Sequence, residues 1–135
     1  MSESAEHISL VHELRRWIAD KYLSGDLGLV LSDTAGIAPA DRSREIDGYV
    51  PDAFVAPIRQ QCAIIGEAKT ATDLESRHSM EQIEMFLRFC NRARGLLVLA
   101  VPWHRVAYMR NTLAQWNRRK GLDVSCCRVL DFLPG

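Results

Sequence analysis

Apolar residues recur at intervals of three or four positions in three segments of the chain. This spacing places them on one face of an α-helix. In the first segment the apolar face comprises Ile8, Val11, Leu14, Ile18 and Tyr22. We therefore predict three helices, over about residues 5–23, 74–94 and 106–120. A glycine follows each of them, as is common at helix ends, and Asp73 is the predicted N-terminal cap of the second helix.

Shorter apolar runs without helical spacing lie between and after these helices, and such runs are typical of buried strands. They predict strands over residues 27–31, 47–56, 62–70, 96–102 and 124–130. The polar segment 34–45 is predicted to be a loop, and Pro57 begins a turn that joins the second strand to the third. The predicted fold is α/β, with helices on both faces of a mixed five-stranded sheet, in the order helix, three strands, helix, strand, helix, strand.

The run from Cys62 to Thr70 contains the most informative polar residues. It leads into Glu67, Ala68 and Lys69, and because side chains alternate along a strand, Glu67 and Lys69 point to the same face. A buried acid and a buried amine are costly unless they are paired or used in chemistry. Two interpretations of these residues stay open: a structural ion pair at a strand end, or a functional site.

The preceding strand is predicted to bring a second carboxylate close to Glu67. In a hairpin that turns at Pro57, the numbers of paired residues sum to about 117 to 119, depending on the turn type. Asp52 then lies opposite residues 65–67, and side chains that are cross-strand neighbours on one face are ~5 Å apart. Asp52 and Glu67 are therefore predicted to converge at one end of the hairpin.

Two carboxylates at that separation repel each other unless a cation lies between them. Hard oxygen ligands in small number favour Mg²⁺ or Mn²⁺, which also take water and substrate phosphate as ligands. Asp47 is an alternative to Asp52, but the same register places it opposite residues 70–72, beyond Lys69. We therefore prefer Asp52 as the partner of Glu67.

Pro51 and Asp52, followed by Glu67, Ala68 and Lys69, resemble the motif of the PD-(D/E)XK nuclease superfamily. The predicted order of elements matches too, so the resemblance covers most of the chain and implies a restriction-endonuclease-like core. It implies that Asp52 and Glu67 hold Mg²⁺ or Mn²⁺ and that the backbone carbonyl of Ala68 is a further ligand. Lys69 is implied to position or activate the attacking water.

The resemblance also points to two residues on helices. Gln82-Ile-Glu-Met-Phe86 is similar to the Gln-x-x-x-Tyr element of RecB-type nucleases, in which the Gln supports the active site. Phe86 replaces the usual Tyr and lacks its hydroxyl. In many members of the superfamily a Glu of the first helix reaches the metal, and Glu13 is the candidate here. The alternative for both Gln82 and Glu13 is a solvated helix residue.

Composition and charge place limits on the class of protein. The length of 135 residues, with 47% hydrophobic and 25% charged residues, suits one globular domain over residues 1–135. No apolar stretch approaches the ~18 residues that span a bilayer, and the N-terminus lacks a secretory signal. We therefore expect a cytoplasmic protein without a membrane partner.

The formal net charge is zero, but its distribution is uneven. Residues 1–75 contain 7 Lys and Arg against 13 Asp and Glu, whereas residues 76–135 contain 10 against 4. Such asymmetry favours contact with nucleic acid, unless the two halves interleave in space and cancel. The first candidates for that contact are Arg77, Arg88, Arg92 and Arg105.

These observations and the resemblance together predict a metal-dependent endonuclease that hydrolyses phosphodiester bonds in DNA. The chain has no room for a separate sequence-reading domain, so we expect a structure-specific or non-specific enzyme, acting as a homodimer or with a protein partner. The alternative is a non-catalytic nucleic-acid-binding or assembly subunit that retains the nuclease fold. Clustered acids argue against that alternative, because they repel phosphate unless a cation is bound.

Overall fold

The computed structural model of the chain describes residues 4–33, 39–58 and 61–132, and its elements follow the predicted order. The helices are α1 (Ala5–Tyr22), α2 (Arg77–Ala93) and α3 (Val106–Lys120). The strands are β1 (Leu31–Ser32), β2 (Ala53–Val55), β3 (Ile64–Ala68), β4 (Leu96–Pro102) and β5 (Cys127–Phe132). Short 3-10 helices are η1 (Leu27–Leu29), η2 (Pro39–Asp41), η3 (Asp73–Glu75) and η4 (Trp103–Arg105).

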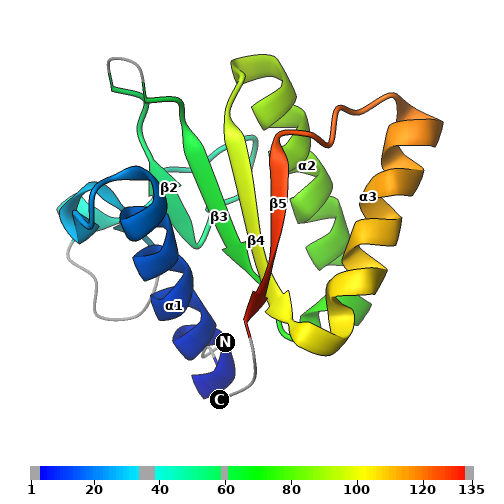
Figure 1. Cartoon of the computed structure of the whole chain (residues 1–135), viewed down its shortest axis with the longest axis horizontal. Helices are drawn as coiled ribbons and strands as arrows, with labels where there is room; N and C mark the ends of the chain where they lie inside the picture. The colour runs from blue at the N-terminus through cyan, green and yellow to red at the C-terminus, as the bar shows by residue number, and fades with distance from the viewer. Residues whose placement is uncertain (1–3, 34–38, 59–60, 133–135) are drawn as a thin grey trace.

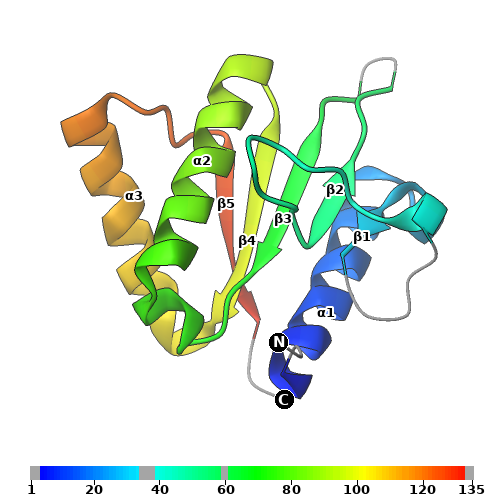
Figure 2. The same ribbon diagram turned by 180° about the vertical axis from the view of Figure 1, so that it is seen from behind.

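The strands form one mixed sheet in the order β1-β2-β3-β4-β5. The pairs β1–β2 and β2–β3 are antiparallel, whereas β3–β4 and β4–β5 are parallel. Figures 1 and 2 show α1 on one face of this sheet and α2 and α3 on the other. The prediction of an α/β fold with a mixed five-stranded sheet between helices is confirmed.

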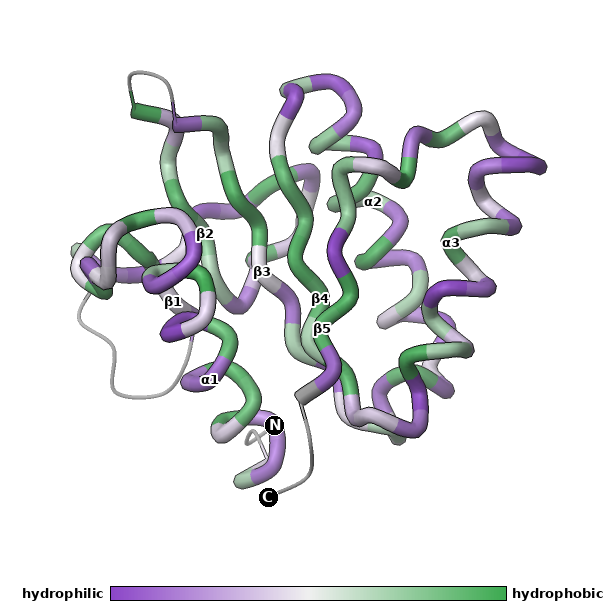
Figure 3. The backbone as a smooth tube through the Cα atoms, in the orientation of Figure 1, coloured by the Kyte–Doolittle hydropathy of each residue, from purple (hydrophilic) through white to green (hydrophobic). Residues whose placement is uncertain are grey.

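Alternation along β3 divides the core into two layers. Ile64 and Ala68 pack in the layer under α1, whereas Ile65 packs in the layer under α2 and α3. By the same alternation Glu67 belongs to the α2 side, at the point where β3 ends. Figure 3 shows that β3 is hydrophobic over most of its length and becomes hydrophilic toward that end. The sheet therefore presents charged groups at the C-terminal end of one of its central strands.

Four of the five predicted strands have other bounds in the structure, and two of them begin later because of a local hydrogen bond. The strand predicted over 27–31 is wrong for most of its length, because Oδ1 of Asp26 accepts a hydrogen bond from the N–H of Gly28 and starts η1 instead. The strand predicted over 124–130 begins later, because the N–H of Cys127 closes a turn before β5. In both cases a local hydrogen bond competes with the sheet.

The strand predicted over 47–56 is reduced to the three residues of β2. Residues 46–49 form a tight turn in which the N–H at each end bonds to the carbonyl at the other. The prediction that Asp73 caps the second helix is also wrong, because Oγ of Ser76 accepts a hydrogen bond from the N–H of Ser79 and caps α2. Of the predicted loop over 34–45 and the turn after Pro57, residues 34–38 and 59–60 lie outside the described part of the chain.

Candidate functional site

The β2–β3 hairpin brings Asp52 and Glu67 together. Ala53 pairs with Gly66, so the paired residue numbers sum to 119 and Asp52 lies opposite Glu67, at the upper limit of the predicted register. The N–H of Asp52 donates to Oε1 of Glu67 at 2.8 Å, and the N–H of Ala68 donates to Oδ2 of Asp52 at 2.9 Å. Each carboxylate is therefore held by a backbone N–H of the opposite strand segment.

Lys69 and Gln82 complete this cluster from the α2 side of the sheet. Nζ of Lys69 lies 3.2 Å from Oε2 of Glu67 and donates to Oε1 of Gln82, in the second turn of α2, at 2.5 Å. The N–H of Lys69 donates to the carbonyl of Ala100 in β4 at 2.9 Å, so the sheet fixes its backbone while α2 fixes its amine. Phe86, one turn after Gln82, is buried in the core.

His7 reaches Asp52 from α1. Its ring Nε2 lies 3.2 Å from Oδ2 of Asp52. The backbone N–H of His7 donates to Oγ of Ser4, which caps the helix. His7 was not among the predicted site residues. The signal was present, because His7 lies four positions before Val11 and seven before Leu14, on the stripe that α1 buries against the sheet.

Two other predicted acids lie elsewhere. Glu13 is exposed on α1, whereas His7 of the same helix contacts Asp52. Asp47, the alternative to Asp52, lies in the turn before β2, and its carboxylate pairs with Arg92 at 2.5 Å. The carboxylate that the hairpin brings to Glu67 is therefore that of Asp52.

The electrostatic environment of Glu67 is unfavourable to its ionised form. Glu67 is 1% exposed, and burial raises its pKa from 4.5 to about 8, with the negative charge of Asp52 as the second cause. The positive charge of Lys69 and hydrogen bonds from Asp52 and Lys69 act in the opposite direction. A bound cation would favour the ionised carboxylate that burial and Asp52 disfavour.

The donor set limits the kind of cation that fits. Among the described residues there is no group of three or more His, Cys, Asp and Glu that could hold a metal ion. A cation at this site would therefore bind the carboxylates of Asp52 and Glu67, the carbonyl of Ala68, and oxygens of water or substrate. Mg²⁺ is commonly held in this way, by one or two carboxylates together with waters and phosphate, so the residues present fit Mg²⁺ or Mn²⁺.

The four arginines predicted to contact nucleic acid are spread over the molecule. Each forms an ion pair with a carboxylate: Arg77–Glu81, Arg88–Glu84, Arg92–Asp47 and Arg105–Glu75. Arg77 and Arg92 lie at opposite ends of α2, ~22 Å apart along its axis. Only Arg77 and Arg105, among these four, lie at the end of the fold where the acids converge.

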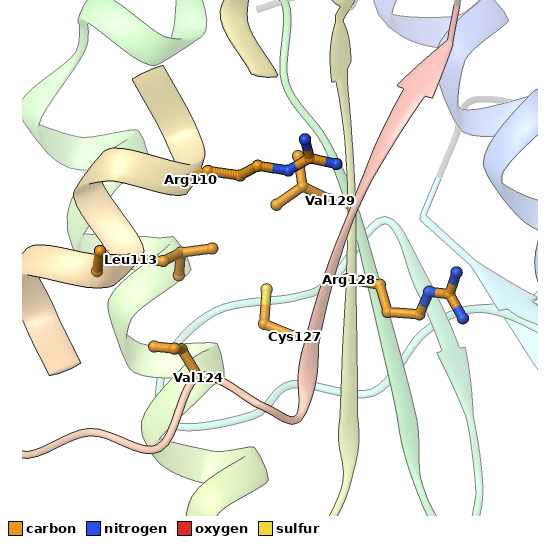
Figure 4. Close-up of a pocket in the computed structure, with 7 residues that line it drawn as sticks. Arg110, Leu113, Val124, Cys127, Arg128 and Val129 are labelled. Carbon is orange, nitrogen blue, oxygen red and sulfur yellow. The ribbon is translucent and has the colours of Figure 1, made fainter. Parts of the chain in front are cut away.

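A cavity of about 390 Å³ lies apart from the acid cluster, between α3 and β5 (Figure 4). Arg110 and Leu113 line it from α3, and Cys127 lines it from β5. Figure 4 shows Arg128 extending to the other side of β5, where its guanidinium lies 5.3 Å from the centre of the Trp17 ring. None of the site residues described above lines this cavity, so it is separate from the candidate site.

Comparison with known proteins gives no match to a family model, to a curated protein or to a solved structure. Among the helices that the structure describes, none combines the length and the apolar composition that crossing a bilayer requires. A function for this chain therefore has to be argued from the site itself.

Proposed function

We propose that the chain is a metal-dependent endonuclease of the PD-(D/E)XK type, with a restriction-endonuclease-like core, that hydrolyses phosphodiester bonds in DNA. The observation that supports this best is the buried cluster at the end of β3. Asp52 lies against Glu67, and Nζ of Lys69 lies 3.2 Å from the Glu67 carboxylate. A structural ion pair between Glu67 and Lys69 would gain nothing from Asp52, whose charge opposes ionisation of Glu67. A cation site, in contrast, gains a second carboxylate ligand from Asp52.

In this proposal Asp52 and Glu67 hold Mg²⁺ or Mn²⁺ together with the carbonyl of Ala68. When bound, the ion would supply Lewis-acid stabilisation of the phosphate oxygens and would lower the pKa of an attacking water. The backbone hydrogen bonds from Asp52 and Ala68 orient the two carboxylates before any ligand arrives. Such preorganisation means that the protein does not have to rearrange when charge develops on the phosphate.

Lys69, Gln82 and His7 have supporting roles. The amine of Lys69 would orient the water and offset charge on a non-bridging phosphate oxygen. The hydrogen bond to Oε1 of Gln82 keeps that amine beside the acids. His7 would orient Asp52 through its contact with Oδ2. The chemistry therefore uses residues from both layers of the fold.

A nicking assay tests the proposal. Supercoiled plasmid and four-way-junction DNA are incubated with the protein in Mg²⁺, in Mn²⁺ and in EDTA. We expect cleavage with either ion and none in EDTA, and we expect Glu67→Gln to lose about 100-fold or more of the rate. Glu45→Gln is the matched control, because Glu45 is an exposed glutamate that precedes β2 and should leave the rate unchanged.

Two results would contradict the proposal. One is a folded parent protein that cleaves neither DNA at any metal concentration. The other is a folded Glu67→Gln variant that cleaves as fast as the parent. Metal-independent binding of DNA without cleavage would instead favour a non-catalytic subunit.

A further inference from the structure

The end of β4 lies beside the acid cluster because β4 is the parallel neighbour of β3. Ala68 pairs with Ala100, and β4 continues to Pro102, where η4 begins. Trp103 therefore lies three residues beyond the level of Ala68, ~10 Å further along the strand direction. Because the C-terminal ends of parallel strands meet at one edge of the sheet, η4 borders the candidate site.

An ion pair fixes η4 to the segment that follows Lys69. One guanidinium nitrogen of Arg105 in η4 lies 3.3 Å from Oε1 of Glu75 in η3. Figures 1 and 2 both show η4, coloured yellow, next to the green segment that leads into α2, at the edge of the sheet where β3 ends. The two turns therefore form a common border to the site.

Three ring side chains lie within residues 103–108, on the η4 side of this border. Trp103 is 54% exposed and Tyr108, in the first turn of α3, is 43% exposed. The ring of His104 lies edge-on to Trp103, with centroids 5.6 Å apart. Tyr108 follows His104 by four residues, just beyond the point where η4 continues into α3. We call Trp103, His104 and Tyr108 the aromatic rim.

Polar residues continue from the rim along the exposed side of α3. Asn111, Gln115 and Arg119 follow Tyr108 at intervals of three or four residues, and all are exposed. Amide and guanidinium groups at this spacing can bond to bases and phosphates, whereas an apolar protein partner would leave them unpaired. The composition of this stripe therefore favours nucleic acid over an apolar surface as the ligand.

We propose that the aromatic rim stacks the bases of single-stranded nucleic acid. Each base has a flat π-face, so exposed rings bind single strands with little regard to sequence. In a duplex those faces are already stacked inside the helix, so the rim selects single-stranded segments. A last step rests on the proposed nuclease function. If that function is correct, a strand held on the rim presents its phosphates to Asp52 and Glu67.

Fluorescence anisotropy in EDTA tests the proposal without any cleavage. The probe is a fluorescein-labelled oligomer of sixteen thymidines. We expect Trp103→Ala to weaken its binding by roughly 5- to 100-fold, Tyr108→Ala to weaken it by less, and Trp103→Phe to retain most of the affinity. Leu29→Ala is the matched control, because Leu29 is 43% exposed on η1, away from the rim. It should bind like the parent.

An abasic oligomer of the same length separates stacking from charge attraction. If the rim stacks bases, Trp103→Ala should weaken binding of the thymidine oligomer but not that of the abasic one. Equal binding of both oligomers by the parent protein, or unchanged thymidine binding by Trp103→Ala, would overturn the proposal. The nuclease proposal can fail without affecting this result, because its test needs metal and cleavage and the binding assay uses neither. Thymidine binding that depends on Trp103, together with cleavage that does not, would overturn only the step that links the rim to Asp52 and Glu67.

Discussion

At the scale of single residues, Glu67 is the acid of the candidate site whose ionisation the fold opposes. Its pKa rises from 4.5 to about 8 because it is buried and lies against Asp52. Between these two pH values the metal-free folded state holds a proton that the unfolded state releases. The resulting stabilisation is fully present below about pH 4.5 and is lost as the pH rises through about 8.

Replacing Glu67 by Gln should remove this dependence. In EDTA, we expect the free energy of unfolding of the parent protein to fall between pH 5 and pH 8, by on the order of 1 kcal/mol for each pKa unit. The Glu67→Gln variant should show a much flatter profile, and the exposed control Glu45→Gln should follow the parent. Urea denaturation monitored by circular dichroism at several pH values measures this. Parallel profiles for Glu67→Gln and the parent would contradict the assignment.

Lys69 allows catalysis and metal binding to be separated. Lys69→Ala should abolish cleavage while it leaves Mn²⁺ binding largely intact, because the amine is assigned to the water rather than to the ion. Plasmid nicking and calorimetric titration with Mn²⁺ measure the two properties. Lys120→Ala, which removes an exposed lysine at the end of α3, should match the parent in both. A folded Lys69→Ala protein that no longer binds Mn²⁺ would argue against this role.

The site residues differ in how far the sequence predicts them. Asp52 and Glu67 were predictable because hairpin register depends only on the turn and the two strands beside it. Gln82 was assigned by resemblance, and the structure brings it to Lys69. His7 was not predicted, because its contact with Asp52 depends on how α1 docks on the sheet, which helical spacing alone does not give.

At the scale of elements, the contact between α1 and β3 depends on Gly66. A Cβ added there would lie 2.9 Å from Cδ1 of Ile18 and 3.0 Å from Cδ2 of Leu14. We expect Gly66→Ala to destabilise the protein by about 1–3 kcal/mol, since overpacking a core costs that much. Gly28→Ala is the control, because its Cβ would meet only the exposed carboxylate of Asp26. Urea denaturation that shows the two variants equally stable would contradict this packing.

Long periodic elements were predicted better than short ones. The helices α1 and α3 and the strand β4 lie where the pattern placed them. The short runs 27–31 and 47–56 were assigned as strands from apolar composition alone. An apolar run has the same composition whether it is extended or turned, and hydrogen bonds such as that from Gly28 to Asp26 decide between the two.

At the scale of the whole molecule, the acidic first half and the basic second half partly interleave. Arg92 pairs with Asp47 and Arg105 pairs with Glu75, so two of the predicted arginines are matched by acids from the first half. Residue counts along the chain could not reveal this, because it depends on which surfaces meet after folding. Ion pairs of this exposed kind contribute little stability, so a DNA phosphate can compete for the arginines.

The position of the arginines predicts which of them matter for DNA. Arg77 and Arg105 lie at the end of the fold where the acids converge, whereas Arg88 and Arg92 lie toward the other end of α2. We expect duplex affinity to fall with salt, with a slope near −0.9 for each phosphate contacted. Replacing Arg77 and Arg105 together by Gln should make that slope shallower, and replacing Arg88 and Arg92 should not. Binding that is indifferent to salt would contradict the prediction.

The central claim is that Asp52 and Glu67 together form a cation site, and thermal melts in EDTA and in millimolar Mn²⁺ test it most directly. The proteins compared are the parent, Asp52→Asn and Asp47→Asn. Asp47→Asn is the matched control, because Asp47 is the exposed aspartate that the hairpin leaves out of the site, and Asn tolerates its positive φ of 51°.

We expect Asp52→Asn to be as stable as the parent in EDTA, or more stable by about 1 kcal/mol, since it removes the charge that repels Glu67. Mn²⁺ should raise the Tm of the parent and of Asp47→Asn, because a ligand that binds only the native state stabilises it by RT ln(1 + [L]/Kd). Mn²⁺ should raise the Tm of Asp52→Asn only slightly. If Asp52→Asn is clearly less stable than the parent in EDTA and Mn²⁺ shifts all three proteins equally, then Asp52 is a structural residue and the cation site is wrong.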